Sequence, residues 1–294
     1  MGKIGFIGLG IMGKPMASNL LKAGKSLVVY DIADAPMKEL AEIGAETAIS
    51  PADVTAKADI IITMLPNSPH VREVVTGKDG ILDTVKNGQI VVDMSSIAPL
   101  VSRELCALLE AKGAEMLDAP VSGGQEKAEK GTLAIMVGGK EDVYSKVKDV
   151  LDLMGKSNYV AGIGAGQTAK LVNQTIVAIN IAAVAEGMSL AKKSGVDPEK
   201  VFNAIRGGLA GSQCMEDKAP RIFEARYNPG FRINLHIKDL GNVQETSHAL
   251  HLSMPLVAQV MEMMQNLAAE GHETLDHGAL GLFYEKLNNI SLKK

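Results

Sequence analysis

The sequence is poor in aromatic residues: it has no tryptophan, and aromatic residues make up 3% of its 294 positions. No block of lysines and arginines is interleaved with aromatics, and the formal net charge is −4, so the composition does not indicate a nucleic-acid-binding surface. The only two cysteines, Cys106 and Cys214, lack the spacing of a disulfide framework or a metal site, which fits a reducing compartment. We expect both thiols to be buried.

Long hydrophobic runs are also missing. The longest, around residues 175–185, is shorter than the roughly 20 residues that a helix needs to cross a bilayer. The N-terminus "MGKIGFIGLG" is apolar, but it lacks an adequate hydrophobic region and the small-residue cleavage site of a signal peptide. We therefore expect a cytoplasmic protein that binds neither membranes nor nucleic acid. The 46% of hydrophobic residues can fill two cores.

The first half of the chain alternates strand and helix patterns, whereas the second half has helix patterns alone. Apolar runs predict strands at 3–7, 26–31, 59–65, 89–95, 115–120 and 132–139, with helices such as 12–23 and 98–112 between them. After Gly166 we expect helices at 167–193, 197–206, 214–226, 236–250 and 254–270. This order predicts an α/β fold: a doubly wound, mainly parallel Rossmann sheet in residues 1–163, then an all-α domain in 164–294 that begins with a long interdomain helix.

The segment "GLGIMG", residues 8–13, follows the first expected strand and opens a helix. In this G-x-G-x-x-G pattern Gly8 permits a tight turn, Gly10 lets a pyrophosphate approach the backbone, and Gly13 lets the helix pack closely on the strand. The pattern indicates dinucleotide binding by the whole loop, which also contains Leu9, Ile11 and Met12. The alternative is a tight turn with only a structural role.

An acidic residue supports dinucleotide binding. Asp31 ends the second expected strand 18 residues after Gly13 (31 − 13), where a carboxylate would bind the adenine ribose hydroxyls. Residues 32–37 contain no Lys or Arg, so a 2′-phosphate would meet this carboxylate with no cation nearby. We therefore expect NAD in preference to NADP.

Five segments occur in an order that resembles the β-hydroxyacid dehydrogenases over essentially the whole chain. They are "FIGLGIMGKPMASNL" (6–20), "DMSSIAP" (93–99), "DAPVSGG" (118–124), "GAGQTAKLVNQ" (164–174) and "HIKDL" (236–240). The resemblance implies a catalytic Lys170, with Asn173 as its partner and a substrate ligand. The other implied roles are the substrate carboxylate site at Ser122, Gly123 and Gly124, cofactor contacts at Leu65, Pro66 and Ser96, and positions near the nicotinamide at Lys238 and Asp239. Family members often carry Arg or Thr after the second strand, whereas Asp31 is followed here by Ile32.

The chemistry of hydride transfer suits these residues. Reduction of an aldehyde places negative charge on the carbonyl oxygen, so a proton donor such as Lys170 must lie within hydrogen-bonding reach. The reverse reaction needs a neutral amine, and we expect burial and a second cation, Lys238, to lower the pKa of Lys170. Asn173 lies three residues on, on the same helical face. The alternatives are a lysine that snorkels to water, an ordinary turn at Ser122–Gly124 and an exposed charged turn at Lys238.

The expected reaction follows from finer similarities. The segments "ITMLPNSPHV" (62–71), "AIRGGLAGS" (204–212) and "PGFRINLHIKDL" (229–240) resemble the branch that reduces tartronate semialdehyde (2-hydroxy-3-oxopropanoate) to D-glycerate. Dehydrogenases of 3-hydroxyisobutyrate and 2-(hydroxymethyl)glutarate are the alternatives, and the pocket around "GGLAGS" and Phe231 would distinguish them. A non-catalytic NAD-binding protein is a further alternative, although it has no need of Lys170. We expect a homodimer or homotetramer and no metal, since His248 and His251 have no recognisable further ligands.

Overall fold

The computed structural model describes residues 2–293. The chain divides after Lys170 into two compact units. The division falls within a long helix that starts a few residues earlier, at Ala165.

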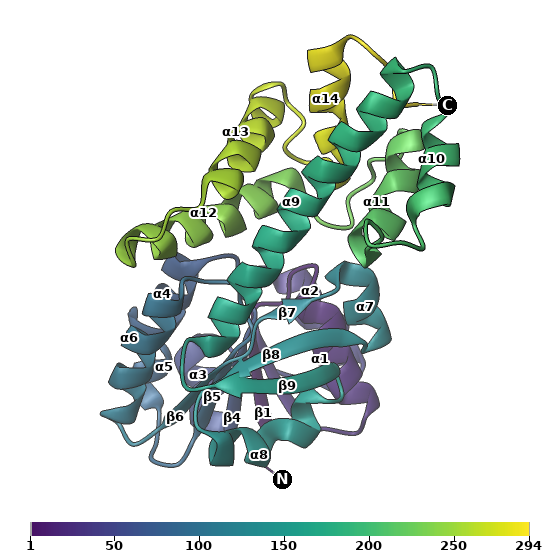
Figure 1. Ribbon diagram of the computed structural model, residues 1–294. Coiled ribbons are helices and arrows are strands. Elements are labelled where there is room, and N and C mark those ends of the chain that lie inside the picture. Colours follow the sequence, from purple (N-terminus) through teal and green to yellow (C-terminus); the bar gives the residue numbers. More distant parts are fainter. Residues whose placement is uncertain (1, 294) are drawn as a thin grey trace. The chain divides into compact units, whose positions relative to one another are not determined.

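The first unit is built on a nine-stranded sheet with the order β3-β2-β1-β4-β5-β6-β8-β7, and β9 pairs with β8 (Figure 1). Neighbours are parallel from β3 through β6 and between β8 and β9, while β8 runs antiparallel to β6 and β7. The expected doubly wound, mainly parallel sheet is thus confirmed. The strands are β1 (Ile4–Ile7), β2 (Leu27–Tyr30), β3 (Glu46–Thr47), β4 (Ile60–Thr63), β5 (Ile90–Asp93), β6 (Glu115–Asp118), β7 (Val121–Ser122), β8 (Leu133–Gly138) and β9 (Gly155–Ala161).

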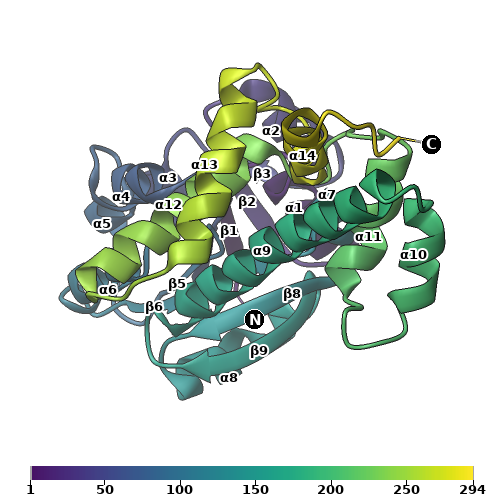
Figure 2. The ribbon, with the colours of Figure 1, turned by 45° about the horizontal axis from the view of Figure 1, so that its top comes forward.

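Helices cover both faces of this sheet (Figure 2), because alternate residues of each buried strand are apolar on opposite sides. Phe6 packs in the core beneath one group of helices and Ile7 in the core beneath the other. The first group is α1 (Gly13–Lys22), α2 (Asp34–Glu42), α7 (Gly124–Lys130) and α8 (Glu141–Leu151). The second is α3 (Pro51–Lys57), α4 (Ser68–Thr76), α5 (Ile81–Thr84) and α6 (Pro99–Glu110).

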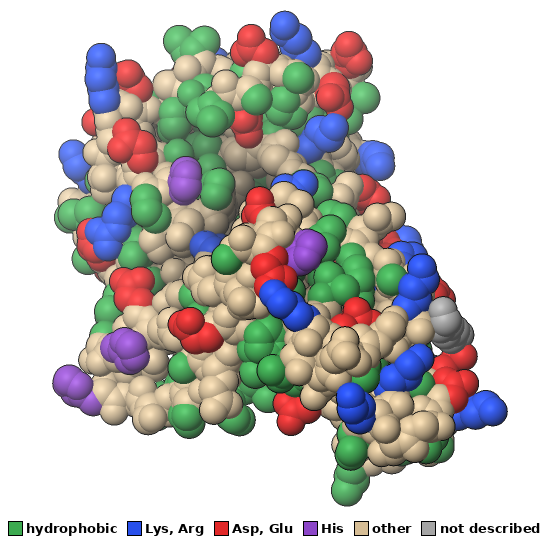
Figure 3. Space-filling model, turned by 90° about the horizontal axis from the view of Figure 1, so that it is seen from above, with side chains coloured by type: hydrophobic (Ala, Val, Ile, Leu, Met, Phe, Trp, Pro, Cys, Tyr) green, Lys and Arg blue, Asp and Glu red, His purple; other side chains and the backbone are tan. Residues whose placement is uncertain are grey.

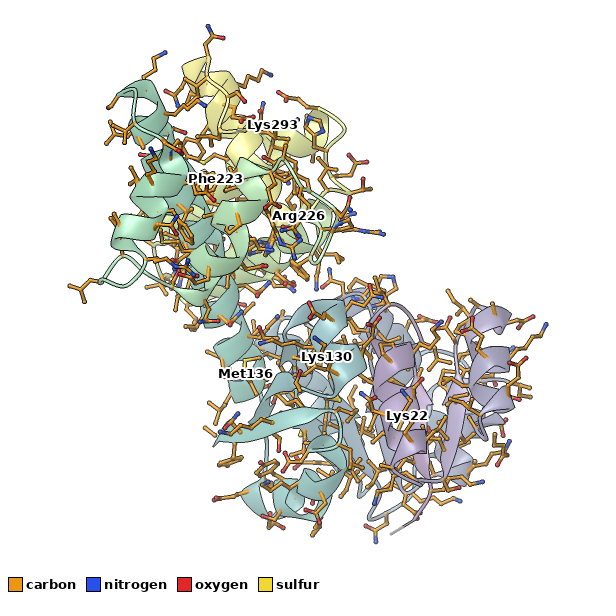
Figure 4. The ribbon with its side chains drawn as sticks, turned by 90° about the vertical axis from the view of Figure 1, so that its right-hand side faces the viewer. Lys22, Lys130, Met136, Phe223, Arg226 and Lys293 are labelled. Atoms are coloured by element: carbon orange, nitrogen blue, oxygen red, sulfur yellow. The ribbon has the colours of Figure 1, made fainter. Side chains whose placement is uncertain are left out.

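The second unit is helical, as expected. Its elements are the greater part of α9 (Ala165–Lys193), then α10 (Pro198–Ile205), α11 (Gln213–Phe223), α12 (Ile233–Ala249), α13 (Pro255–Ala269), the short 3-10 helix η1 (His277–Ala279) and α14 (Leu280–Asn288). Phe223 at the end of α11 is almost completely buried in this unit (Figure 4). Isolated bridge pairing between Arg232 and Asp276 is the only β-type contact that we find in the described part of this unit.

Helix α9 is longer and more apolar than residues 175–185 suggested: by length and hydropathy alone it could cross a membrane, which corrects that expectation. The core helix of a soluble protein passes the same test, and α9 contributes Ala178, Ile181 and Ala185 to the helical core. Cys106 is buried as expected and Cys214 is partly buried. Burial raises the pKa of each thiol to about 11.

Candidate active site

The three glycines of the loop after β1 have different surroundings. A Cβ on Gly8, whose φ is +94°, would lie 2.3 Å from the carbonyl oxygen of Met64, and a Cβ on Gly13 would lie 1.9 Å from that of Gly8. A Cβ on Gly10 would meet no atom of residues 2–293 within 4 Å. The first and third glycines are therefore required by the protein itself, whereas Gly10 faces open space at the N-terminus of α1. This geometry fits a bound pyrophosphate.

The expected ribose ligand lies against this loop. Asp31 Oδ2 accepts a hydrogen bond from the Leu9 N–H at 2.6 Å, and Oδ1 accepts one from the Ala33 N–H at 2.8 Å. Each carboxylate oxygen can accept a second hydrogen bond, so both remain able to bind hydroxyl groups. The adjacent Ile32 is 94% exposed and does not pack over the Asp31 carboxylate. The carboxylate of Asp31 thus both braces the glycine loop and remains available to a ligand.

The cofactor residues expected after β4 and β5 lie at the same sheet edge as the glycine loop, because β1, β4 and β5 are parallel neighbours. The Leu65 N–H donates to Ser95 Oγ at 2.8 Å, which joins the two loops. Pro66 and Ser96 follow these residues directly. The carboxyl edge of parallel strands is where open α/β sheets bind ligands, so the structure brings the expected cofactor positions of the first unit together.

A buried carboxylate that was not among the predicted site residues holds the start of α9. Asp118, at the end of β6, accepts hydrogen bonds from the N–H groups of Gly164 and Gln167, both at 2.7 Å. The side chain of Gln167 in turn donates to the Ser95 carbonyl at 2.7 Å and accepts from the Ile97 N–H at 3.1 Å. Burial raises the pKa of Asp118 to about 7, although the two N–H groups act in the opposite direction. These bonds tie the first turn of α9 to the loop after β5.

Lys170 is buried on α9, with 6% of its surface exposed. Its Nζ donates to the carbonyl oxygen of Val121 at 2.7 Å, and Ser122, Gly123 and Gly124 follow Val121 directly. Lys170 therefore does not snorkel to water, and it lies beside the segment expected to bind a carboxylate.

The candidate carboxylate segment has an unusual backbone. Gly123 has φ +141° and Gly124 has φ +68°, a region in which residues with side chains are strained. Successive N–H groups in such a turn, at the start of α7, can form a concave anion site. Ser122 is half-buried on the short strand β7. The segment is therefore more specialised than an ordinary strand-to-helix turn.

Four further polar residues are connected within the helical unit. Asn173 Nδ2 donates to Gln174 Oε1 at 2.8 Å, and Gln174 Nε2 donates to Asp239 Oδ2 at 2.6 Å. Lys238 Nζ lies 2.8 Å from Asp239 Oδ1. The side chains of Lys238 and Asp239 are 20% and 2% exposed, so the pair belongs to helix α12 and is not an exposed charged turn. Gln174 was not among the expected site residues.

Phe231 is held by a buried polar cluster that the sequence did not reveal. Its ring packs edge-on against those of His236 and His277, at centroid distances of 5.7 and 5.4 Å. The two imidazoles are joined through their Nδ1 atoms, 2.8 Å apart. The N–H of Phe231 donates to Asp276 Oδ2 at 3.1 Å, and Lys218 Nζ pairs with the other carboxylate oxygen at 2.9 Å. No three His, Cys, Asp or Glu side chains within residues 2–293 are grouped so as to hold a metal ion.

A Rossmann sheet, a glycine loop open to a pyrophosphate and a buried lysine define an NAD(P)-dependent oxidoreductase. Comparison with known proteins agrees with this class. Residues 3–164 match the family model of the NAD-binding domain of 6-phosphogluconate dehydrogenase, and residues 164–283 match that of the NAD-binding region of NADP-dependent 3-hydroxyisobutyrate dehydrogenase. The chain belongs to the β-hydroxyacid dehydrogenase family, whose members act on CH–OH groups.

Individual relatives cover nearly the whole chain. The 2-hydroxy-3-oxopropionate reductase of Escherichia coli is 44% identical over 99% of this chain and 99% of its own length. The 2-(hydroxymethyl)glutarate dehydrogenase of Eubacterium barkeri is 37% identical over 99% of this chain and 97% of its own. The solved structure of a Mycobacterium tuberculosis 3-hydroxyisobutyrate dehydrogenase with L-serine has a TM-score of 0.89 at 33% identity and covers 96% of this chain and 98% of its own.

Proposed function

We propose that this protein reduces tartronate semialdehyde to D-glycerate with NADH. Membership of the family supports 3-hydroxyacid dehydrogenase activity. The choice of substrate rests on the higher identity to the E. coli 2-hydroxy-3-oxopropionate reductase, 44%, than to the E. barkeri 2-(hydroxymethyl)glutarate dehydrogenase, 37%.

The observation that carries the proposal is the position of Lys170. Its Nζ is buried and lies 2.7 Å from the carbonyl oxygen of the residue before Ser122. When bound, NADH supplies a hydride to the aldehyde carbon. Lys170 donates the proton that the carbonyl oxygen then needs. Ser122 and the N–H groups of Gly123 and Gly124 bind the carboxylate, and Asn173 binds the substrate hydroxyl.

The preference for NADH rests on Asp31. Its carboxylate lies against the glycine loop, where it accepts from the Leu9 N–H, and residues 32–37 supply no cation. A 2′-phosphate placed close to this carboxylate would be repelled without compensation. We therefore propose that NADPH is the poorer cofactor.

Steady-state kinetics with two aldehydes and two cofactors test the proposal. Methylmalonate semialdehyde carries a methyl group where tartronate semialdehyde has its hydroxyl. A site built to pair a hydroxyl leaves a buried polar group unsatisfied with the methyl compound. We expect kcat/KM to be at least about 10-fold lower for it. Equal or greater efficiency with the methyl compound would assign the protein to the 3-hydroxyisobutyrate branch, and no turnover of any small aldehyde acid would indicate a non-catalytic NAD-binding protein.

We also propose that the protein is a cytoplasmic homodimer or homotetramer that binds neither membranes nor nucleic acid. Large apolar side chains are exposed on the helical unit, among them Leu190 at 71% and Leu256 at 55%. A second subunit would cover such side chains. Lysine, arginine and acidic side chains are interspersed on the face shown in Figure 3, which does not suit a polyanion. Sedimentation analysis tests the proposed oligomeric state, and a monomer would contradict it.

A further inference from the structure

A surface cavity of about 580 Å3 extends along α1 from the glycine loop. Residues of the loop, of α1 and of α2 line it near the loop: Leu9, Gly10, Lys14, Pro36 and Glu39. The N–H of Leu9 donates to Asp31, the expected ligand of the adenine ribose. The cavity therefore adjoins the position at which NADPH carries a 2′-phosphate and NADH a hydroxyl.

Lys14 lies over the glycine loop. Its backbone N–H donates to the Gly10 carbonyl oxygen at 3.1 Å, and a side chain on a helix leans back over the preceding turn. A Cβ at Gly10 would meet no described atom within 4 Å, so this turn is open to a ligand. Residues 32–37 supply no cation, and Lys38 of α2 does not line the cavity. Lys14 is therefore the cation that the fold places at the loop end of the cavity.

Glu39 neutralises this cation. Lys14 Nζ pairs with Glu39 Oε2 at 2.7 Å, and the two side chains are 41% and 58% exposed. An ion pair as exposed as this contributes little to stability. It has a larger consequence for a ligand, because a 2′-phosphate would meet the carboxylates of Asp31 and Glu39 while the ammonium of Lys14 is already paired. A hydroxyl group at the same position carries no charge and is not repelled.

We propose that the Lys14–Glu39 ion pair is a second determinant of the cofactor: Glu39 holds Lys14 away from the 2′ position of the adenine ribose and so adds to the rejection of NADPH by Asp31. Lys14 is then a phosphate ligand that becomes available when Glu39 loses its charge. The proposal rests on the proposed function, which makes Asp31 the ligand of the adenine ribose and NADH the preferred cofactor.

Two nucleotides that differ only in the 2′-phosphate test the proposal without turnover. Isothermal titration calorimetry gives the Kd of 2′,5′-ADP and of 5′-AMP for the wild type and each variant. Glu39→Gln keeps the size of the side chain and removes its charge. We expect this substitution to lower the Kd of 2′,5′-ADP about 5- to 10-fold, the scale of one charge-assisted hydrogen bond, and to leave the Kd of 5′-AMP within about 2-fold.

A double-mutant cycle identifies Lys14 as the phosphate ligand. Lys14→Met alone leaves the Glu39 carboxylate without its cation and should not tighten the binding of 2′,5′-ADP. Combined with Glu39→Gln, it should abolish the gain. The matched control is Lys22→Met, because Lys22 also belongs to α1 and lines the same cavity (Figure 4). Lys22 lies eight residues (22 − 14), or about 12 Å along the helix, beyond Lys14. The gain should survive Lys22→Met.

Three results would overturn the proposal: an unchanged Kd of 2′,5′-ADP in Glu39→Gln, a gain that persists after Lys14→Met is added, or an equal gain for 5′-AMP. The last would assign Lys14 to the phosphate that both nucleotides share. In steady-state kinetics Glu39→Gln should raise kcat/KM for NADPH relative to NADH by the same factor. If the wild type uses both cofactors equally, the proposed preference for NADH is wrong, and the cycle of Kd values still decides the role of Lys14.

Discussion

Two alanine substitutions in the glycine loop should separate folding from cofactor binding. At Gly13 a Cβ would lie 1.9 Å from the carbonyl oxygen of Gly8, 2.9 Å from its carbonyl carbon and 3.2 Å from Cε1 of Phe6. None of these atoms belongs to a flexible surface side chain. At Gly10 a Cβ would meet no atom of the described residues within 4 Å.

The size of the effect at Gly13 can be worked from this distance. Ordinary contact of a Cβ begins at 3.4 Å, so α1 would have to move away from the loop by about 1.5 Å (3.4 − 1.9). Met16 and Leu20 of α1, both fully buried, would lose packing as it moved. Overpacking of a well-packed core costs about 1 to 3 kcal/mol. We expect Gly13→Ala to lower the free energy of unfolding by about 3 kcal/mol, at the upper end of that range.

Gly10→Ala should leave folding unchanged and impair the cofactor site. Its free energy of unfolding should stay within about 0.5 kcal/mol of wild type, as is usual for surface substitutions. The added methyl group would occupy space that a pyrophosphate needs beside the backbone. We expect the Kd for NADH to rise at least about 10-fold, which corresponds to about 1.4 kcal/mol.

Urea unfolding of the ligand-free protein and fluorescence titration with NADH measure the two effects. Gly162→Ala is the control, because Gly162 is exposed in the same unit and a Cβ there would meet no described atom within 4 Å. It should change neither quantity. The reasoning is refuted if Gly10→Ala binds NADH as tightly as wild type, or if Gly13→Ala is as stable as Gly10→Ala.

Four further outcomes can be checked. Lys170→Ala should lower kcat at least about 100-fold with little change in NADH binding; more than about a tenth of wild-type kcat would contradict its role as the acid. Asp31→Arg should narrow a kcat/KM preference for NADH over NADPH that we expect to be roughly 5- to 150-fold, and equal use of NADPH by the wild type would show that Asp31 does not select the cofactor. Burial raises the pKa of Asp118 to about 7, so the folded protein retains a proton that the unfolded chain loses near pH 4. The stability that this proton contributes is therefore lost as the pH rises from about 4 to 7. Between pH 5 and pH 8 the free energy of unfolding, measured with urea, should fall less in Asp118→Asn than in the wild type, and an identical fall would exclude this carboxyl as the cause. Lys218→Met leaves Asp276 buried without its cation and should lower the free energy of unfolding by about 3 kcal/mol. Adding Asp276→Asn to this variant should make the loss of stability smaller. If the losses from the two single substitutions simply add in the double variant, the ion pair does not stabilise the fold.

Periodicity and composition were sufficient to predict the sheet because its central strands are buried on both faces and are therefore apolar. The run expected as a strand at 59–65 contains β4 (Ile60–Thr63), and the run at 89–95 contains β5 (Ile90–Asp93). Each run exceeds its strand at both ends: the polar Asp59 and Gln89 precede the strands, and the apolar Met64 and Met94 follow them. The ends of the strands could therefore be located only from the hydrogen bonds of the sheet.

Strand β9 was not predicted because its inward-facing positions are not all apolar. Its segment "GKSNYVA" has polar residues at alternate positions, and Lys156 and Asn158 are exposed while Ser157 is buried. Tyr144 of α8 bonds Ser157 Oγ at 2.9 Å, so a polar residue occupies the inward position. An alternation rule looks for apolar residues on the inward face. That rule cannot recognise a strand whose inward residue is a hydrogen-bonded serine.

In the candidate site, too, some residues could be predicted from the sequence and others could not. The glycine loop and Lys170 belong to short motifs, so their positions could be predicted. The supporting bonds join residues that are far apart in sequence: Gly164 to Asp118 across 46 residues, Gln174 to Asp239 across 65, and Gln167 to Ser95 across 72. No spacing rule contains such pairs, and without the fold Gln167 and Gln174 are two more polar residues on a helix.

These bonds explain why an apolar helix opens with polar residues. The buried residues of α9 include the polar Gln167, Lys170 and Gln174 near its start and the apolar Ala178, Ile181, Ala185 and Met188 further on. Polar residues are thus concentrated in the first turns, although Leu171 among them is apolar and Ser189 near the other end is polar. Burial of a polar group is unfavourable unless it is hydrogen-bonded, and each of the three has a buried partner: the Ser95 carbonyl, the Val121 carbonyl and the Asp239 carboxylate. Apolar side chains at these positions would need no partners of their own, but they would leave the Ser95 and Val121 carbonyls and the Asp239 carboxylate with one hydrogen bond fewer. Proteins depart from the apolar pattern chiefly at functional sites. We therefore propose that the polar residues in the first turns of α9 belong to the active site, whereas Ala178, Ile181, Ala185 and Met188 pack in the helical core.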